Sequence, residues 1–451
     1  MAIVGSGPSG FYAAAALLDA GEAAADGAPG VRVDMFDRLA TPWGLVRAGV
    51  APDHPKIKSV SSQYEKTAAR PGFRFFGHVE LGEHITREEL LERYDAVIYA
   101  VGSQTERRLG VDGEDLPGSV ASVDFVGWYN GHPDYVDLSP SLDAERAVVI
   151  GAGNVALDVA RMLLLPEADL RATDTADHAL DALVGASVHE VVVCGRRGAL
   201  QASFTTTELR ELNDIDGLTV VVGPEQVPDD GGDDDSLSKG VRRNLAALHA
   251  WAEAGPDPDA DRRMEFRFLR SPIEIRGTDR VEEIVLGVNR LEADAEGRVR
   301  AVDTGERETI PCGLVLRAVG YRGVALPGVP FDEASGTIPH DAGRVSERDR
   351  EYVVGWIKRG PTGIIGTNRK DANETVRTLL ADLTAGAGDE AEVPSAAEVE
   401  QWLLERCPDL VDLDGWAAID AHERGAGEPS GRPRVKVVDR SGFVDLLPDP
   451  R

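Results

Sequence analysis

The order of apolar and polar positions in the first part of the chain predicts a strand, a helix and a second strand. Residues 2–4 are apolar and predict a short buried strand, and residues 11–20 are rich in Ala and Leu and predict a helix. Residues 31–36 alternate as a second strand, and residues 94–102 form another apolar stretch that ends in glycine. Strands that alternate with helices are typical of parallel sheets in α/β proteins.

The same order recurs further along the chain. A strand is predicted at 147–150, a helix at 155–165 and another strand at 188–194, and the apolar stretch 314–320 closes this second unit. A chain of 451 residues has room for two or three domains of about 100–200 residues each. We therefore expect an α/β fold with two Rossmann-like dinucleotide-binding domains. A further helical run at 372–383 follows Gly360-Pro361-Thr362-Gly363.

Charge and cysteine content narrow the possible functions. The net charge of −30 argues against nucleic acid as a partner, because Lys and Arg must neutralise its phosphates. The three cysteines are far apart and form no CxxC pair, so we expect no disulfide framework, no iron–sulfur cluster and no metal. An acidic run at 228–236 predicts a surface loop.

The chain shows no sign of a membrane protein. No apolar run approaches the about 18 residues needed for insertion as a spanning helix. The N-terminus has neither a basic stretch nor a cleavage motif of the kind that marks secretion. We therefore expect a cytoplasmic protein without membrane insertion.

The first glycine motif is Gly5-Ser6-Gly7-Pro8-Ser9-Gly10, between the first strand and its helix. In such a turn the first glycine allows the sharp bend, the second lets the backbone approach a pyrophosphate, and the third lets the helix pack on the sheet. Asp37 ends the second strand, where a carboxylate accepts hydrogen bonds from ribose hydroxyls. The alternative is an ordinary glycine-rich turn, which the strand context and Asp37 disfavour.

The second motif, Gly151-Ala152-Gly153-Asn154-Val155-Ala156, has a different residue type at the end of its second strand. Arg196 and Arg197 stand there in place of an acid. Arginine binds the 2′-phosphate of NADP by donating charge-assisted hydrogen bonds to it, whereas an acidic side chain would repel it. A solvated basic pair is the alternative. The first site therefore suits a dinucleotide with a free 2′-hydroxyl and the second suits NADP. The simplest reason for two such sites is that one holds a flavin permanently and the other binds NADPH transiently, so that hydride can pass from nicotinamide to flavin.

Six longer strings resemble the adrenodoxin-reductase type of ferredoxin–NADP(+) reductase, and are most similar to its bacterial, actinobacterial-like branch. The six strings are residues 41–47, 49–55, 125–131, 153–161, 204–212 and 355–363. The resemblance as a whole runs from residue 2 to about residue 440, in the same order as in that family. The resemblance implies an NADP domain inserted into a discontinuous FAD domain. We expect the FAD domain at 1–104 and 320–451, with a C-terminal helical tail, and the NADP domain at 105–319.

The resemblance also implies the residues that contact each cofactor. For FAD these are Gly5, Gly7, Ser9, Gly10, Asp37, Leu45, Leu81, Trp356, Gly363, Ile364 and Ile365. For NADP they are Arg107, Ala152, Gly153, Asn154, Val155, Arg196, Arg197, Glu208 and Gly363. His54 and Glu211 match the polar pair beside the nicotinamide and flavin rings. A plain structural contact for His54, and a charged helix face for Glu208 and Glu211, are the alternatives.

The implied activity is hydride transfer from NADPH to FAD, followed by single-electron transfer to ferredoxin. Since the chain has no CxxC cluster, that iron–sulfur carrier has to be another protein. Two other functions remain open: an NADPH–FAD reductase of another acceptor, such as flavodoxin or a quinone, and a non-catalytic flavoprotein that binds nucleotides. We expect a monomer.

Overall fold

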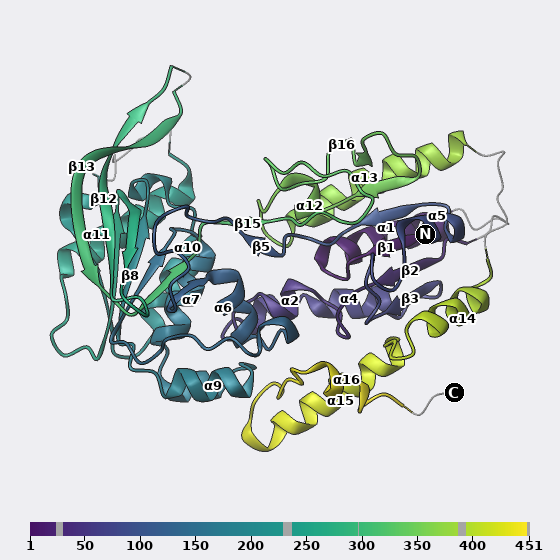
Figure 1. Ribbon diagram of the computed structural model, residues 1–451, viewed down its shortest axis with the longest axis horizontal. Helices are drawn as coiled ribbons and strands as arrows, with labels where there is room; N and C mark the ends of the chain where they lie inside the picture. The colour runs from purple at the N-terminus through teal and green to yellow at the C-terminus, as the bar shows by residue number, and fades with distance from the viewer. Residues whose placement is uncertain (24–29, 229–236, 296, 387–393, 449–451) are drawn as a thin grey trace. The chain divides into compact units, whose positions relative to one another are not determined.

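The computed structural model describes residues 1–23, 30–228, 237–295, 297–386 and 394–448, so most of the expected acidic loop at 228–236 lies outside the described residues. The chain divides into two compact units (Figure 1). Unit 1 consists of residues 1–105 and 320–451, and unit 2 of residues 106–319. Two short strands lie at the crossings, β5 (Thr105–Glu106) and β15 (Tyr321–Arg322), and the Gln104 amide donates to the Arg322 carbonyl at 3.1 Å.

Unit 1 is built on a seven-stranded sheet of order β16-β17-β18-β4-β1-β2-β3. The five strands from β18 to β3 in this order are parallel, and β17 and β16 add an antiparallel edge next to β18. The bounds are β1 Ala2–Val4, β2 Val33–Phe36, β3 Phe73–Phe76, β4 Val97–Tyr99, β16 His340–Asp341, β17 Arg344–Val345 and β18 Glu351–Val353. In this doubly wound order, ligands bind at the carboxyl ends of the parallel strands.

Helices cover both faces of the unit 1 sheet, and α1 packs against α13 on one of them. Because both faces are covered, successive strand residues all meet a core: Ile3 packs in one hydrophobic cluster, and Ala2 and Val4 pack in the other. The helices are α1 Pro8–Ala23, α2 Leu45–Ala48, α3 Pro55–Lys58, α4 Ser61–Ala68, α5 Arg87–Arg93, α12 Trp356–Arg359, α13 Thr367–Ala385, α14 Ala396–Arg406, α15 Leu413–Gly427 and α16 Arg440–Val444.

Unit 2 contains a fully parallel six-stranded sheet of order β6-β14-β7-β8-β10-β9. Its strands are β6 Ser119–Ala121, β7 Arg146–Ile150, β8 Glu190–Gly195, β9 Leu218–Val222, β10 Arg262–Phe268 and β14 Leu314–Arg317. One face carries α6 Ser122–Tyr129, α7 Asn154–Leu164, α8 Glu167–Arg171, α9 Asp177–Val184, α10 Thr206–Glu211 and α11 Lys239–Ala254. Their apolar side chains form one large core with that face.

A three-stranded antiparallel sheet covers the other face of the parallel sheet in unit 2. It consists of β11 (Arg270–Arg276), β12 (Glu283–Ala293) and β13 (Val299–Pro311), and the long β12–β13 hairpin is conspicuous in Figure 1. Ile284 and Leu286 of this sheet pack with Val148 and Val192 of the parallel sheet. The sequence patterns did not predict these three strands.

The α/β fold with two Rossmann-like sheets is confirmed, although some elements differ in extent from the expectation. The strand predicted at 94–102 is only Val97–Tyr99, because the chain turns afterwards at Gly102 with a φ of +70°. The helix predicted at 372–383 begins earlier, at Thr367. Its first turns contain the buried polar residues Asn368 and Asp371, whose hydrogen-bond partners replace the apolar periodicity that marks a helix in sequence.

Candidate dinucleotide-binding sites

The first glycine turn joins β1 to α1 in unit 1. Gly5 has a φ of +107°, and a Cβ atom there would lie 2.5 Å from the carbonyl oxygen of Ala100. A Cβ at Gly10 would lie 2.2 Å from the Gly5 oxygen. By contrast, a Cβ at Gly7 would meet no described atom within 4 Å. The fold therefore requires two of these glycines, whereas Gly7 faces open space of the kind that a bound diphosphate would fill.

Asp37, at the end of β2, is tied to this turn. Its Oδ2 accepts from the Ser6 amide at 2.8 Å and from the Ser6 hydroxyl at 2.5 Å, and its Oδ1 accepts from the Leu39 amide at 2.9 Å. A carboxylate oxygen has two lone pairs, so Oδ1 can accept one more hydrogen bond. Asp37 can therefore both fix the turn and accept from a sugar hydroxyl.

The loop after β2 lies directly on the same turn. The Trp43 amide donates to the Ser6 carbonyl at 3.1 Å. Gly44 has a φ of +50°, and a Cβ atom there would lie 2.8 Å from the Cα of Gly7. Leu45 follows as the first residue of α2. Leu45 is thus held beside the glycine turn by backbone contacts on its N-terminal side.

The other residues expected to contact FAD lie around Trp356, in the segment before α13, and at one position in the hydrophobic core. Ser9 lies beside the residue before Trp356, since a Cβ at Gly355 would be 2.1 Å from the Ser9 hydroxyl. Gly363 has a φ of +80° and leads through Ile364 and Ile365 to α13. Leu81 is different, because its side chain is 8% exposed and packs in the core with Phe36.

Several features of unit 1 fit a large planar ligand. The indole Nε1 of Trp356 is buried and has no hydrogen-bond partner among the described residues. Ile364 is 67% exposed, more than any other large apolar residue in the described part of the chain. No side chain caps the N-terminus of α13, and the amides of its first three residues donate to the carbonyls of residues 364–366. What this helix end offers to an electron-rich group is therefore the positive end of the helix dipole. The unit thus offers apolar contact, a free donor and a diphosphate turn.

The second glycine turn joins β7 to α7 in unit 2. Gly151 has a φ of +147°, and a Cβ there would lie 2.2 Å from the Ala318 oxygen. Gly153 is the N-cap of α7 and provides no capping side chain. The Asn154 side chain accepts from the Thr205 amide at 2.7 Å, which ties the turn to the start of α10. Ala152 accepts from the Ser203 amide at 2.8 Å, and Val155 follows within the first turn of α7.

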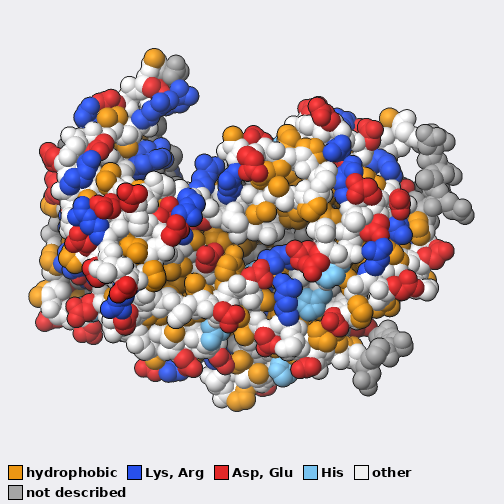
Figure 2. Space-filling model, viewed as in Figure 1, with side chains coloured by type: hydrophobic (Ala, Val, Ile, Leu, Met, Phe, Trp, Pro, Cys, Tyr) orange, Lys and Arg blue, Asp and Glu red, His pale blue; other side chains and the backbone are white. Residues whose placement is uncertain are grey.

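Arg196 and Arg197 follow β8 directly and are exposed. Neither guanidinium makes an ion pair or hydrogen bond with another residue in the described part of the chain, and the same is true of Arg107, which is also exposed. Acidic and basic side chains are interspersed on the face shown in Figure 2, so partners for arginine are common on this protein. Two adjacent unpaired guanidinium groups at the end of the second strand are suited to a phosphate.

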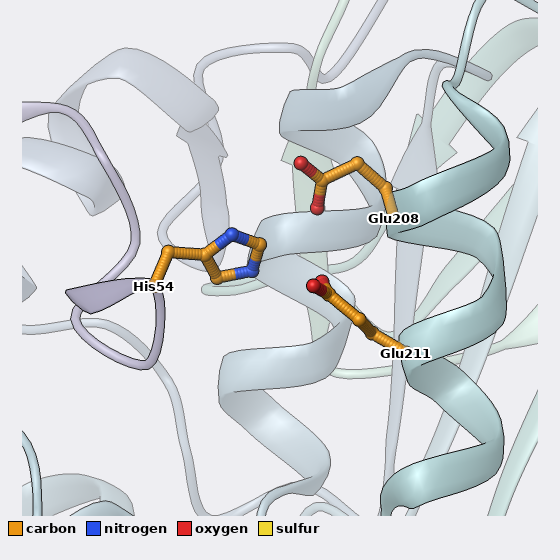
Figure 3. A group of neighbouring side chains, drawn as sticks. All are labelled: His54, Glu208 and Glu211. Atoms are coloured by element: carbon orange, nitrogen blue, oxygen red, sulfur yellow. The ribbon is translucent and has the colours of Figure 1, made fainter. Parts of the chain in front are cut away.

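Glu208 and Glu211 lie on successive turns of α10, with their carboxylates directed to the same side of the helix (Figure 3). Glu208 is buried and Glu211 is partly exposed. Both face the guanidinium of Arg161 in α7, whose Nη1 lies 3.4 Å from the Glu208 carboxylate and 3.9 Å from that of Glu211. Burial argues against a solvated helix face for Glu208, whereas for Glu211, whose side chain is 37% exposed, that alternative stays open.

His54, also labelled in Figure 3, belongs to unit 1. It is the N-cap of α3, its side chain is buried, and its Nε2 lies 3.7 Å from Asp53 Oδ1. Gly363 likewise belongs to unit 1, whereas the other residues expected to contact NADP belong to unit 2. Of the two residues expected beside the nicotinamide and flavin rings, His54 therefore belongs to unit 1 and Glu211 to unit 2.

Two buried ionic side chains near these residues were not identified from the sequence. Arg161 is 2% exposed, and Glu423 in α15 is fully buried against Arg47 of α2. Arg47 and Arg161 do fall within the strings that carried the family resemblance, but Glu423 lies in the tail, where no local pattern marked it. No helix in the described part of the chain is sufficiently long and apolar to cross a bilayer.

Comparison with known proteins identifies relatives along the whole chain. The family model described as pyridine nucleotide-disulphide oxidoreductase matches residues 1–213. The NADPH-ferredoxin reductase FprA of Mycobacterium tuberculosis is 58% identical, over 99% of this chain and 98% of the relative. The mitochondrial NADPH:adrenodoxin oxidoreductase of Homo sapiens is 39% identical, over 99% and 91%.

A solved structure agrees with these sequence relatives. The structure described as Mycobacterium tuberculosis FprA in complex with NADPH superposes with a TM-score of 0.96 at 56% identity, covering 99% of this chain and 98% of that one. The superposition covers both units and the C-terminal tail. The chain belongs to the adrenodoxin-reductase type of ferredoxin–NADP reductases, within the pyridine nucleotide-disulphide oxidoreductases.

Proposed function

We propose that this chain is an NADPH–ferredoxin reductase, in which hydride from NADPH is received by a bound FAD and single electrons leave to a ferredoxin. The observation that carries the proposal is the contrast between its two glycine turns. Asp37 stands at the end of the second strand of one unit, and two unpaired arginines stand at the same place in the other. The relatives named as NADPH–ferredoxin and NADPH:adrenodoxin reductases support it.

In this proposal unit 1 is the FAD domain and unit 2 is the NADP domain. FAD would be held by the turn at Gly5, Gly7, Ser9 and Gly10, by Asp37, Leu45 and Leu81, and by Trp356, Gly363, Ile364 and Ile365. NADP would be held by Ala152, Gly153, Asn154, Val155, Arg196, Arg197 and Glu208, with Arg107 and Gly363 as further contacts. Bound FAD supplies the conversion of a two-electron donor into single electrons.

The chain's own contribution is mainly positioning and charge. The uncapped N-terminus of α13 would stabilise negative charge that develops on the reduced ring. Glu208 and Glu211, fixed by Arg161, would orient the nicotinamide carboxamide together with His54. Hydride transfer needs the two rings to be aligned at close distance, so none of these groups has to act as a base.

The cysteines favour a one-electron acceptor over a disulfide substrate. Disulfide reductases of this family type need a reactive thiol pair, whereas Cys194, Cys312 and Cys407 are all buried and unpaired. Burial raises the pKa of each thiol, so the nucleophilic thiolate is scarce at neutral pH. Electrons therefore leave the cofactor without passing through a cysteine of this chain. Unpaired thiols also suit the reducing cytoplasm, where we propose that the enzyme works as a monomer.

The first experiment is extraction and identification of the cofactor from the purified protein, followed by anaerobic mixing with NADPH. We expect FAD, and we expect its yellow absorption to bleach. A yellow protein that does not bleach would indicate a non-catalytic flavoprotein.

Parallel assays with ferredoxins, a flavodoxin and a quinone then identify the electron acceptor. Faster turnover with a quinone or a flavodoxin than with ferredoxin would favour a reductase of that other acceptor. Sedimentation velocity tests the monomer.

A further inference from the structure

A buried ion network connects the C-terminal tail to the loop that lies on the first glycine turn. The Glu423 side chain, in α15, is fully buried and pairs with Arg47 of α2. We propose that Glu423 is a positioning residue: through Arg47 it holds the loop of residues 41–49 against the glycine turn, and thereby retains FAD. This inference rests on the proposed binding of FAD in unit 1.

The carboxylate of Glu423 is saturated with hydrogen bonds. Oε1 accepts from Arg47 Nη2 at 2.5 Å and from the Val437 amide at 2.9 Å, and Oε2 accepts from Arg47 Nη1 and from Arg434 Nη1, each at 2.8 Å. Two bonds to each oxygen use all of its lone pairs. Burial acts to raise the pKa of Glu423, but Arg47 and Arg434 outweigh it and lower the pKa to about 2. Glu423 is therefore an ionised, immobilised anchor.

The loop depends on neighbours for its position. The helix that carries Arg47, α2, has only four residues and no side-chain cap, so it has little stability of its own. On one side the loop touches the glycine turn, through the Trp43 amide on Ser6 and through Gly44 against Gly7. On the other side it meets α15, where the Arg47 guanidinium also lies 5.5 Å from the centre of the Trp416 ring.

This arrangement makes the tail the outer support of the flavin turn. If Glu423 loses its charge, Arg47 remains largely buried without a counter-charge, whereas Arg434 keeps its ion pair with Asp420 at 2.8 Å. An unpaired, buried Arg47 is strongly unfavourable unless it moves towards water. Movement of Arg47 carries α2 with it, and α2 follows Gly44 directly in the chain. The contact of Gly44 with Gly7 then loosens at the point where we place the diphosphate.

The test measures FAD release rather than activity, in the full-length holoprotein. Flavin fluorescence after dilution gives the release rate for Glu423→Gln and Arg47→Gln, and thermal unfolding gives the stability of each variant. The matched control is Asp34→Asn, because Asp34 also makes a bidentate pair with an arginine, Arg74, at 2.6 and 2.8 Å. Asp34 lies near the amino end of β2, away from the glycine turn.

We expect Glu423→Gln to release FAD about tenfold faster (~1.4 kcal/mol) than the unsubstituted protein. Asp34→Asn should release it at the original rate even where its unfolding temperature falls as far. The double variant Arg47→Gln/Glu423→Gln should release FAD no faster than the faster single variant, since both substitutions break the same ion pair.

Three results would overturn the inference. One is equal release rates for Glu423→Gln and Asp34→Asn, and another is additive effects of Arg47→Gln and Glu423→Gln. If Glu423→Gln does not fold, the Arg47→Lys variant tests the inference instead, since lysine keeps the charge and loses the bidentate geometry. The third contradicting result is an unchanged rate of FAD release in Arg47→Lys. An unsubstituted protein that contains no FAD would instead contradict the proposed function.

Discussion

Nη1 of Arg161 lies 3.4 Å from the carboxylate of Glu208, and both side chains are buried in unit 2. Nη2 of the same guanidinium lies 3.0 Å from Asp158, and Glu211 is 3.9 Å from Nη1. One buried cation thus faces three carboxylates, two of which we place at the nicotinamide. Such a cluster depends strongly on the positive charge of Arg161, because buried like charges repel without the screening of bulk water.

Replacing Arg161 with Met should therefore slow the reduction of the flavin by NADPH, by about tenfold or more. Stopped-flow measurement of flavin reduction at neutral pH checks this, with Arg161→Lys expected to recover part of the rate. As a control, Arg171→Met removes an exposed pair with Glu167 at 2.7 Å. Equal rates of flavin reduction for Arg161→Met and the unsubstituted protein would contradict the prediction.

Arg196 and Arg197 should determine the preference for NADPH. Replacing either with Ala should raise the KM for NADPH about tenfold or more, since a hydrogen bond to a charged group contributes about 1.5–3 kcal/mol. The KM for NADH should change little, because NADH has no 2′-phosphate. Steady-state assays with both cofactors, and with Arg171→Ala as a control in the same unit, decide the matter. Equal increases for NADH and NADPH would remove this assignment.

Gly7 and Gly10 should respond differently to the same substitution. Gly7→Ala should fold with near-normal stability, because a Cβ atom there meets no described atom within 4 Å, but its methyl group should exclude the diphosphate and lower the FAD content. Gly10→Ala would place Cβ 2.2 Å from the Gly5 oxygen and should destabilise the fold itself. Flavin content and thermal unfolding of the two variants check this. A Gly7→Ala protein that retains full FAD would show that the diphosphate lies elsewhere.

Glu106, at the first crossing between the units, should make stability depend on pH. Burial raises its pKa to about 7 from an ordinary value of 4.5, although Val319 and Ser122 donate hydrogen bonds to the carboxylate. The folded chain therefore binds a proton that the unfolded chain has released between these two values, so the free energy of unfolding should fall as pH rises from about 4.5 to 7. Glu106→Gln should flatten this slope. Urea unfolding of both proteins at pH 5 and pH 8 measures the difference, and parallel slopes would contradict the prediction.

The features predicted correctly from the sequence were those with a local signal. Each glycine turn follows an apolar strand and opens a helix, so the α/β class with two Rossmann-like sheets could be identified from short segments. The three-stranded sheet of β11 to β13 was missed because its strands are exposed over much of their length, and its alternation of apolar residues is correspondingly weak. Its apolar contacts are concentrated in a few residues such as Ile284 and Leu286.

The residues of the candidate site also divide into those with a local signal in the sequence and those without one. Asp37, Arg196 and Arg197 could be proposed as cofactor contacts because they stand at the ends of predicted strands, where the position alone indicates a role. The pairing of Arg47 with Glu423 spans 376 positions in the chain, and no pattern around Glu423 indicates its partner. Arg161 was hidden for another reason: on a helix an arginine normally faces water, and its burial follows only from how α7 and α10 pack together.

The discontinuity of unit 1 has a consequence for biosynthesis. Strand β4 pairs with β18, and the segment after β3 pairs with Val411, so both contacts need residues that leave the ribosome after all of unit 2. A nascent chain can therefore complete unit 2 while the N-terminal strands still lack their neighbours. With FAD in unit 1, as we propose, flavin uptake becomes a late event, after translation is nearly finished. Termination soon after Val319 would leave a folded unit 2 attached to an incomplete unit 1.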